Sequence, residues 1–408
     1  MIKSVASVKV KGRRVLLRAG FDVPLEADGS GGFKVVDDAR IKAGLPTITK
    51  LLKEKAKVII INHSGRPEGK WNKDFSQLPV AQRLADLLNL RLIKIKDEFP
   101  TYKQSKNLYF YTEDFTTANV VKLSKALPEG EILFLENLRF YPGEEKNDSK
   151  FVSVLAKLGD VYVDDAFSVA HREAASNVGI AGKLPAYAGL TLLEEINSLN
   201  KAKKPVSPLV VIMGGAKISD KIDTIHFLAK KAEKVLIGGA IANSFLSAKG
   251  YEIGTSKASD ISLAKELLRE YRDKIILPID VVVARSPDDS RRSITPDKVR
   301  ANESIFDIGP ETIRKFAQIV KTAKTLIWNG PMGLIEKKEF SFGSMAVAQM
   351  FAAQTKGKAY GVVGGGESLE VVDRAHVAEF IDHVSTGGGA MLEYLSGKTL
   401  PAIKALDK

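Results

Sequence analysis

The chain has 408 residues, 44% of them hydrophobic, a net charge of +12 and no cysteine. This length corresponds to about two domains of roughly 100–200 residues, each able to bury its own core. The missing cysteine excludes disulfides, thiolate metal sites and a cysteine nucleophile.

The positive charge is concentrated in the first hundred residues, which contain 20 Lys/Arg residues and 11 Asp/Glu residues. Acidic residues interrupt the basic ones, so no basic block forms. This pattern favours small anionic substrates over nucleic acid as the partner.

The first residues, Met1–Lys11, are interrupted by lysines and lack the apolar core of a signal peptide. No apolar run reaches the roughly 18–20 residues that a membrane span needs. We therefore expect a soluble, cytoplasmic protein with no membrane partner, and we expect it to be a monomer.

The first half alternates short apolar runs with helical patterns, as in βαβ units around a parallel sheet. Helical patterns cover residues 80–88 and 150–158. The strand-like runs are Val15–Leu17, Val58–Ile61, Ile132–Leu135 and Val161–Val163.

The second half repeats this alternation, with helical patterns at 261–271, 311–323 and 344–354. Its strand-like runs are Leu209–Ile212, Val235–Ile237, Thr325–Trp328 and Tyr360–Val363. A helical stretch, Leu193–Lys203, lies between the halves and is flanked by prolines. The sequence thus predicts an α/β protein with two Rossmann-like parallel-sheet lobes, 1–185 and 208–390, joined by a hinge helix and linker, 186–207.

Most of the chemically distinctive motifs directly follow a strand-like run. In open parallel sheets, ligands bind beyond the carboxyl ends of the strands. In the first half these motifs are basic, and arginine pairs bidentately with carboxylate and phosphate groups. The alternative is that each arginine pairs with a neighbouring acid such as Asp165 or Glu136. The candidate anion-binding residues are Arg40, His63, Arg66, Arg139 and Arg172.

In the second half the motifs after the strands are rich in glycine. Glycine lets backbone N–H groups approach phosphate oxygens, and a helix N-terminus adds a favourable dipole. The segment Gly397–Thr399 resembles the end of a P-loop, but Leu392 stands where a P-loop needs glycine. The glycine motifs are Met213–Lys221, Gly238–Ala240, Trp328–Gly333, Gly364–Ser368 and Ser385–Gly389.

These motifs, in this order and over essentially the whole chain, resemble the signatures of phosphoglycerate kinases. The resemblance implies reversible phosphoryl transfer between ATP and the carboxylate of 3-phosphoglycerate, giving 1,3-bisphosphoglycerate and ADP. It also implies Mg²⁺ with ATP or ADP as cofactor, 3-phosphoglycerate on the N-terminal lobe, the nucleotide on the C-terminal lobe, and a tail, 391–408, that packs back on the N-terminal lobe. The nucleophile would be a carboxylate that is already ionised, so no general base is needed.

The matching motifs also imply roles for single residues. The motifs imply catalytic roles for Lys217, Arg40 and Gly388, and a metal-binding role for Glu367. The substrate-binding residues are Asp22, Arg40, His63, Arg66, Arg139 and Arg172. The nucleotide-binding residues are Lys217, Lys221, Gly238, Gly239, Asn329, Glu336, Gly365, Gly366, Glu367 and Ser368.

Three positions depart from the family pattern. The usual Arg-x-Asp-x-Asn-Val-Pro reads Arg18–Pro24 here, with Gly20 replacing an acid and Asp22 replacing an amide. The usual Gly-Gly-Gly-Asp ends in Glu367. These departures leave open an alternative function, a phosphoglycerate-kinase-like binding protein with weak or no turnover.

Overall fold

The computed structural model describes residues 2–29, 31–100 and 106–407. The chain forms two compact units: one contains the residues up to Ile196 and those from Thr399 onward, the other Asn197–Lys398. The boundary falls inside helix α6 (Leu190–Lys203). Both units combine helices with a large sheet, so the predicted α/β class is confirmed.

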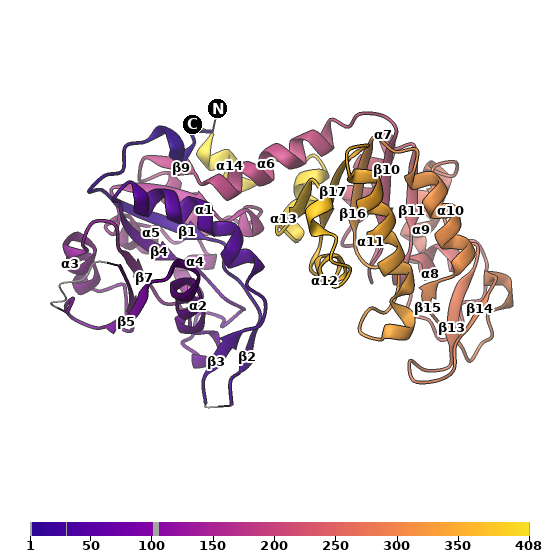
Figure 1. Cartoon of the computed structure of the whole chain (residues 1–408), viewed down its shortest axis with the longest axis horizontal. Helices are drawn as coiled ribbons and strands as arrows, with labels where there is room; N and C mark the ends of the chain where they lie inside the picture. The colour runs from indigo at the N-terminus through magenta and orange to yellow at the C-terminus, as the bar shows by residue number, and fades with distance from the viewer. Residues whose placement is uncertain (1, 30, 101–105, 408) are drawn as a thin grey trace. The chain divides into compact units, whose positions relative to one another are not determined.

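A seven-stranded sheet with the order β5-β6-β7-β4-β1-β8-β9 forms the centre of the first unit (Figure 1). All of its strand pairs are parallel, and the four predicted strands of this half are among them. The strands are β1 (Arg14–Ala19), β4 (Lys57–Ile61), β5 (Arg91–Ile95), β6 (Asn107–Tyr111), β7 (Ile132–Phe134), β8 (Val161–Asp165) and β9 (Ala186–Ala188).

Helices pack against this sheet, and its central strands are buried on both faces, as expected for a parallel sheet. Ile48 and Leu51 of α1 join Val58 and Ile60 in the core. Beside the sheet lies the hairpin of β2 (Leu25–Ala27) and β3 (Phe33–Val35). The helices are α1 (Ala39–Lys53), α2 (Leu78–Leu88), α3 (Ala118–Ala126), α4 (Pro142–Glu145), α5 (Ser149–Ala156) and α14 (Pro401–Leu406).

The C-terminal helix α14 belongs to the first unit. It contacts β9 and the short π-helical turn η5 (Ala175–Gly179). The backbone N–H of Ala402 donates a hydrogen bond to the carbonyl of Ala170 over 3.1 Å. The end of the chain therefore completes the unit in which the chain begins.

The second unit contains a six-stranded parallel sheet with the order β12-β11-β10-β16-β17-β18. Trp328, Phe316 and Phe351 lie in its core, and the four predicted strands of this half are confirmed. The strands are β10 (Leu209–Met213), β11 (Lys234–Ile237), β12 (Ile275–Ile276), β16 (Thr325–Asn329), β17 (Tyr360–Gly364) and β18 (His383–Ser385). The helices are α7 (Ile222–Lys231), α8 (Gly239–Ala248), α9 (Ile261–Glu270), α10 (Pro310–Val320), α11 (Phe342–Thr355), α12 (Gly366–Arg374) and α13 (Gly389–Leu395).

An additional antiparallel sheet lies in the second unit, with β13 (Val281–Ala284) between β14 (Arg292–Ile294) and β15 (Ser304–Ile308). The predicted elements did not include it. The apolar run of β13 was missed, whereas polar residues interrupt β14 and β15.

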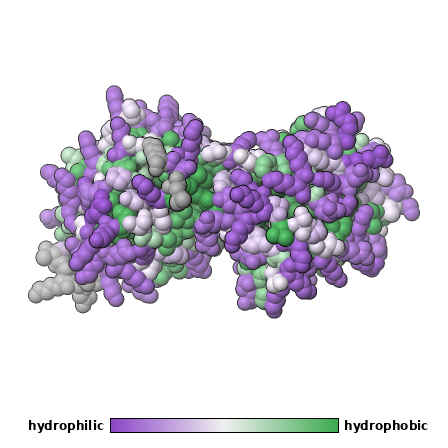
Figure 2. All heavy atoms as spheres, turned by 90° about the horizontal axis from the view of Figure 1, so that it is seen from above, coloured by the Kyte–Doolittle hydropathy of each residue, from purple (hydrophilic) through white to green (hydrophobic). Residues whose placement is uncertain are grey.

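Hydrophilic side chains cover most of the surface visible in Figure 2, with hydrophobic groups scattered between them. Within the described part of the chain, no helix combines the length and the apolar character needed to cross a membrane.

Candidate active site

A buried arginine lies at the centre of the basic cluster in the first unit. Arg18, near the end of β1, donates from Nε to Ser176 Oγ over 2.8 Å. Its Nη2 lies 2.9 Å from Nδ1 of His63, which follows β4. The sequence-based list of site residues missed Arg18, although a charged residue at the end of the apolar run Val15–Leu17 was a signal.

His63 is buried and neutral. Burial lowers its pKa well below 6.5, and the charges of Arg18, Arg139, Arg40 and Arg172 lower it further. Because a guanidinium group can only donate, Nδ1 accepts and the ring carries its proton on Nε2. The donor of the ring is therefore Nε2–H, which lies on the side of Asp22.

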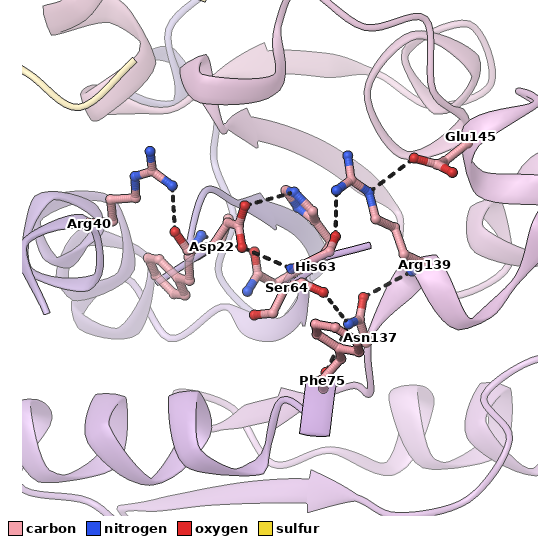
Figure 3. Close-up of polar contacts among 12 residues, drawn as sticks. Asp22, Arg40, His63, Ser64, Phe75, Asn137, Arg139 and Glu145 are labelled. Carbon is pink, nitrogen blue, oxygen red and sulfur yellow. Dashed lines mark hydrogen bonds and ion pairs between the residues drawn. The ribbon is translucent and has the colours of Figure 1, made fainter. Parts of the chain in front are cut away.

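Asp22 lies beside His63, with Oδ2 3.6 Å from His63 Nε2 (Figure 3). Its Oδ1 accepts a hydrogen bond of 3.0 Å from the backbone N–H of Gly65. Arg40, in the first turn of α1, donates to the backbone carbonyl of Asp22. Three of the predicted substrate-binding residues, Asp22, Arg40 and His63, are therefore brought together.

Arg139 follows β7 and lies next to the loop after β4. Its Nη1 donates to the Gly65 carbonyl over 2.6 Å, and its Nε lies 3.4 Å from Glu145 Oε1. Burial lowers the pKa of Arg139. The amide of Asn137 donates to the carbonyl of Ser64 over 2.8 Å, so the two loops are held together (Figure 3).

The two acids suspected of pairing with the arginines have other partners. Glu136 accepts from Ser76 Oγ over 2.7 Å and from a backbone N–H. Asp165 accepts from the backbone N–H of Leu192 in α6 over 3.0 Å. The arginine cluster is therefore not neutralised by these carboxylates.

The remaining two predicted anion-binding residues are exposed. Arg172 belongs to the same region, since its charge lowers the pKa of both His63 and Arg139. Arg66 lies on the loop after β4, and among the described residues none forms an ion pair or hydrogen bond with its side chain. The structure thus joins Arg40, Arg139 and Arg172 around His63, while Arg66 stands at the surface.

In the second unit, a half-buried lysine, Lys221, connects two of the glycine-rich loops. Lys221 Nζ donates to the Gly214 carbonyl over 2.7 Å and to Asn329 Oδ1 over 2.5 Å. Burial lowers its pKa to about 8, against the opposing charges of Glu367 and Asp220. The ammonium group thus positions the loops after β10 and β16.

Asn329 and Ser368 extend this connection to the loop after β17. The Asn329 amide donates to the Gly364 carbonyl over 2.7 Å, and Ser368 Oγ accepts from the Gly330 N–H over 2.7 Å. Glycine is required where the loops meet: a Cβ on Gly214 would lie 2.0 Å from the Pro331 carbonyl oxygen. The predicted residues Gly365 and Gly366 begin the turn into α12, with Gly365 at φ +100°.

A cavity of about 390 Å³ lies beside these loops. Three predicted nucleotide-binding residues line it, Gly239, Glu336 and Glu367. Gly238 precedes Gly239 at the start of α8, and Lys217 is exposed on the loop after β10. Gly388 lies at φ +54° directly before α13.

Further polar residues line the cavity that the sequence did not predict, among them Asn243 and Asp307. Asn243 of α8 is buried, and its amide donates to the Lys257 carbonyl over 3.0 Å. Asp307 of β15 accepts from the Gly343 N–H over 2.8 Å, and burial raises its pKa to about 7. Both stand inside apolar segments, Ile241–Leu246 and Ile305–Ile308, where a polar side chain is a signal for a site.

Glu367 is the candidate metal ligand. It lies in the first turn of α12, and its pKa is raised by burial and by the charge of Glu336, while Lys221 lowers it. No cluster of three or more potential protein ligands for a metal occurs in the described ranges. A carboxylate oxygen suits Mg²⁺, which usually takes only one or two protein carboxylates and completes its shell with phosphates and water.

Comparison with known proteins decides the family. Residues 5–398 match the family model of phosphoglycerate kinase. The chain belongs to the phosphoglycerate kinase family. Phosphoglycerate kinases from Pelotomaculum thermopropionicum and Desulfosudis oleivorans are each 41% identical to it, over 99% and 100% of this chain and 98% and 99% of theirs.

Solved phosphoglycerate kinase structures agree with this assignment. The enzyme from Coxiella burnetii is 37% identical, with a TM-score of 0.81 over 100% of this chain and 99% of that chain. The enzyme from Pyrococcus horikoshii is 31% identical, with a TM-score of 0.83 over 99% and 98%.

The three departures from the phosphoglycerate kinase motifs have distinct surroundings. Asp22 keeps a backbone partner, the Gly65 N–H, and stays beside His63. Glu367 remains at the start of α12 and lines the cavity. Gly20 lies close to the neighbouring strand, since a Cβ on it would be 3.3 Å from Ala166 Cα and 3.4 Å from Ser168 Oγ.

Proposed function

We propose that this protein catalyses reversible phosphoryl transfer between ATP and the carboxylate of 3-phosphoglycerate, giving 1,3-bisphosphoglycerate and ADP. The observation that carries the proposal is the cluster of Arg40, Arg139 and Arg172 around neutral His63 in a member of this family. No observation favours the alternative of a binding protein with weak turnover.

The first unit binds 3-phosphoglycerate in this proposal. Arg40, Arg139 and Arg172 bind the carboxylate and phosphate, and guanidinium groups suit both. His63 donates its Nε2–H, because burial and the neighbouring arginines keep the ring neutral. No proton has to be removed from the attacking carboxylate, so these residues need only orient it.

The second unit binds the nucleotide. Gly239 and Glu336 line the cavity proposed for the nucleoside, and Lys221, Asn329 and Ser368 hold the loops proposed to meet the phosphates. Lys217, exposed on its loop, is free to follow the phosphoryl group and stabilise its charge. Glu367 would bind Mg²⁺, which when bound neutralises charge on the nucleotide phosphates.

We also propose that the protein acts as a monomer in the cytoplasm without nucleic acid. Membership of a family whose substrates are small molecules supports a function without nucleic acid. Light scattering of the purified protein tests the oligomeric state.

A coupled assay tests the function. The protein receives 3-phosphoglycerate and Mg-ATP, and 1,3-bisphosphoglycerate is reduced by a dehydrogenase that oxidises NADH. We expect turnover in the range of roughly 1–10³ s⁻¹ that is typical of enzymes, dependent on both substrates and abolished by EDTA. Tight binding of both ligands without turnover would instead establish the alternative.

A further inference from the structure

A chain of buried hydrogen bonds ends at His63 in the first unit. Arg18 Nη2 lies 2.9 Å from His63 Nδ1, and Arg18 Nε donates to Ser176 Oγ over 2.8 Å. The Ser176 hydroxyl group donates to Glu144 Oε1 over 2.6 Å, and the Ser176 N–H donates to Glu144 Oε2 over 3.1 Å. Each of the four side chains is at most 2% exposed. The chain therefore joins β1, the loop after β4, η5 and α4.

The direction of each hydrogen bond in this chain is fixed. A guanidinium group only donates, so Ser176 Oγ and His63 Nδ1 both accept from Arg18. The single proton of the Ser176 hydroxyl group is then left for Glu144, whose carboxylate accepts it. Ser176 thus offers Arg18 a lone pair because Glu144 takes its proton.

The Ser176 hydroxyl group separates a buried positive group from a buried negative one. Arg18 Nε and Glu144 Oε1 contact the same hydroxyl oxygen. Burial raises the pKa of Glu144 and the charge of Arg18 opposes this rise, so the two groups attract each other. Such attraction is stronger in a buried environment than in water. Without the hydroxyl group, the guanidinium would be drawn toward Glu144 and away from His63.

Ser176 is itself held in place by its turn. The turn η5 is π-helical, and Tyr162 Oη donates to the Ser176 carbonyl over 2.7 Å. The amide of the next residue, Asn177, donates to the Arg172 carbonyl over 3.0 Å. Short π-helical segments often occur at functional sites. The turn that holds the side chain of Arg18 therefore also holds the backbone of Arg172.

We propose that Ser176 is a positioning residue for 3-phosphoglycerate: its hydroxyl group keeps Arg18 on His63 and prevents a direct ion pair between Arg18 and Glu144. The inference rests on the proposed function, because it concerns the binding of that substrate. With Arg18 on Nδ1, the ring of His63 is held in one orientation with its donor at Nε2. With Arg18 on Glu144, the ring would lose this partner, and its N–H would no longer have a fixed direction.

Three variants of the full chain test this role. Ser176→Ala removes the hydroxyl group, and Ser176→Ala combined with Glu144→Gln also removes the competing charge. Ser124→Ala is the matched control, because Ser124 on α3 is equally buried and also accepts from an arginine, Arg14 Nη1 at 3.2 Å. Calorimetry measures the Kd of 3-phosphoglycerate and of ADP, and NMR of the ring nitrogens measures the titration of His63.

We expect Ser176→Ala to weaken 3-phosphoglycerate about five- to tenfold, the range of one net hydrogen bond, and to change ADP binding less than twofold. The titration midpoint of His63 should rise, because after burial the charge of Arg18 is the largest cause that lowers its pKa. Ser124→Ala should change neither Kd nor the titration. The double variant should bring the Kd of 3-phosphoglycerate back to within about threefold of wild type, since the competing charge is gone.

Equal losses in Ser176→Ala and Ser124→Ala would indicate a general loss of stability and overturn the inference. An unchanged titration of His63, or a double variant that binds no better than Ser176→Ala, would also overturn it. If Ser176→Ala does not fold, Ser176→Cys takes its place, because a thiol is only a weak acceptor and should cause the same changes. A wild type that does not bind 3-phosphoglycerate would overturn the proposed function, whereas the titration of His63 would still show whether the hydroxyl group holds Arg18.

Discussion

Arg18 Nη2 lies 2.9 Å from His63 Nδ1, and each of the two side chains is only 2% exposed. A buried charge is costly unless neighbouring groups accept its hydrogen bonds. Here Ser176 Oγ and His63 Nδ1 are two of the acceptors, and neither is an ionised group. The contact sets which nitrogen of His63 carries the proton, while the charge of Arg18 also acts on the buried carboxylates of Glu144 and Asp164.

The first prediction concerns the protonation of His63. Burial and four arginines lower its pKa well below 6.5, so the ring should stay neutral, with its proton on Nε2, as the pH falls from 8 to 6. NMR of the ring nitrogens measures this, and His63→Gln assigns the signal among the five histidines. A titration midpoint near 6.5 would contradict the buried environment.

The same shift has a consequence for stability. Below pH 6.5 the unfolded chain binds a proton at His63 that the folded protein does not bind. Proton uptake by the unfolded chain lowers the free energy of unfolding as the pH falls below 6.5. Above pH 6.5 His63 is neutral in both states, so this loss of stability is absent. Urea unfolding of the wild type and His63→Gln at pH 7.5 and 5.5 should show the wild type losing more stability than the variant.

The second prediction concerns Arg40 and Arg172. Replacing either with alanine should weaken 3-phosphoglycerate binding at least tenfold, because a charged hydrogen-bond partner of the substrate is lost. ADP binding should stay within twofold, since the nucleotide residues lie in the other unit. Arg91→Ala, on β5 of the first unit, is the matched control. Equal losses of both ligands would indicate unfolding or a wrong site.

The third prediction concerns Lys217. Lys217→Ala should lower kcat by on the order of 10²–10³ with a smaller effect on KM, because its charge is needed most in the transition state. The coupled assay measures this. Lys265→Ala, exposed on α9 of the same unit, should behave as wild type. Activity of Lys217→Ala within twofold of wild type would remove Lys217 from the mechanism.

The fourth prediction concerns Glu367. Glu367→Gln keeps the size of the side chain but removes its charge, so Mg-ADP binding should weaken much more than binding of metal-free ADP. Titration calorimetry with and without Mg²⁺ gives both values. Glu370→Gln, on the same helix and 3.6 Å from Arg374, is the control. If the two losses are equal, Glu367 only stabilises the N-terminus of α12.

The strands and the motifs that follow them could be predicted from the sequence alone. Fully buried parallel strands read as continuous apolar runs, and Val58–Ile61 and Leu209–Ile212 are such runs. His63 and Gly214 follow strands, so local order along the chain was enough to place them at a sheet edge. In the antiparallel sheet, β14 and β15 lack such a signal because polar residues interrupt them, although β13 is an apolar run, Val281–Ala284.

Contacts between distant segments were decided only by the tertiary structure. Arg18 and His63 are 45 positions apart, and Lys221 and Asn329 are 108 apart, so no local pattern could join them. Because β8 runs next to β1, Ser168 comes close to Gly20, a residue 148 positions earlier in the sequence. The sequence thus determined which residue types follow each strand, because that depends on neighbours in the chain. The order of strands in the sheet determined which of those residues meet, because pairing between strands depends on the packing of the whole unit.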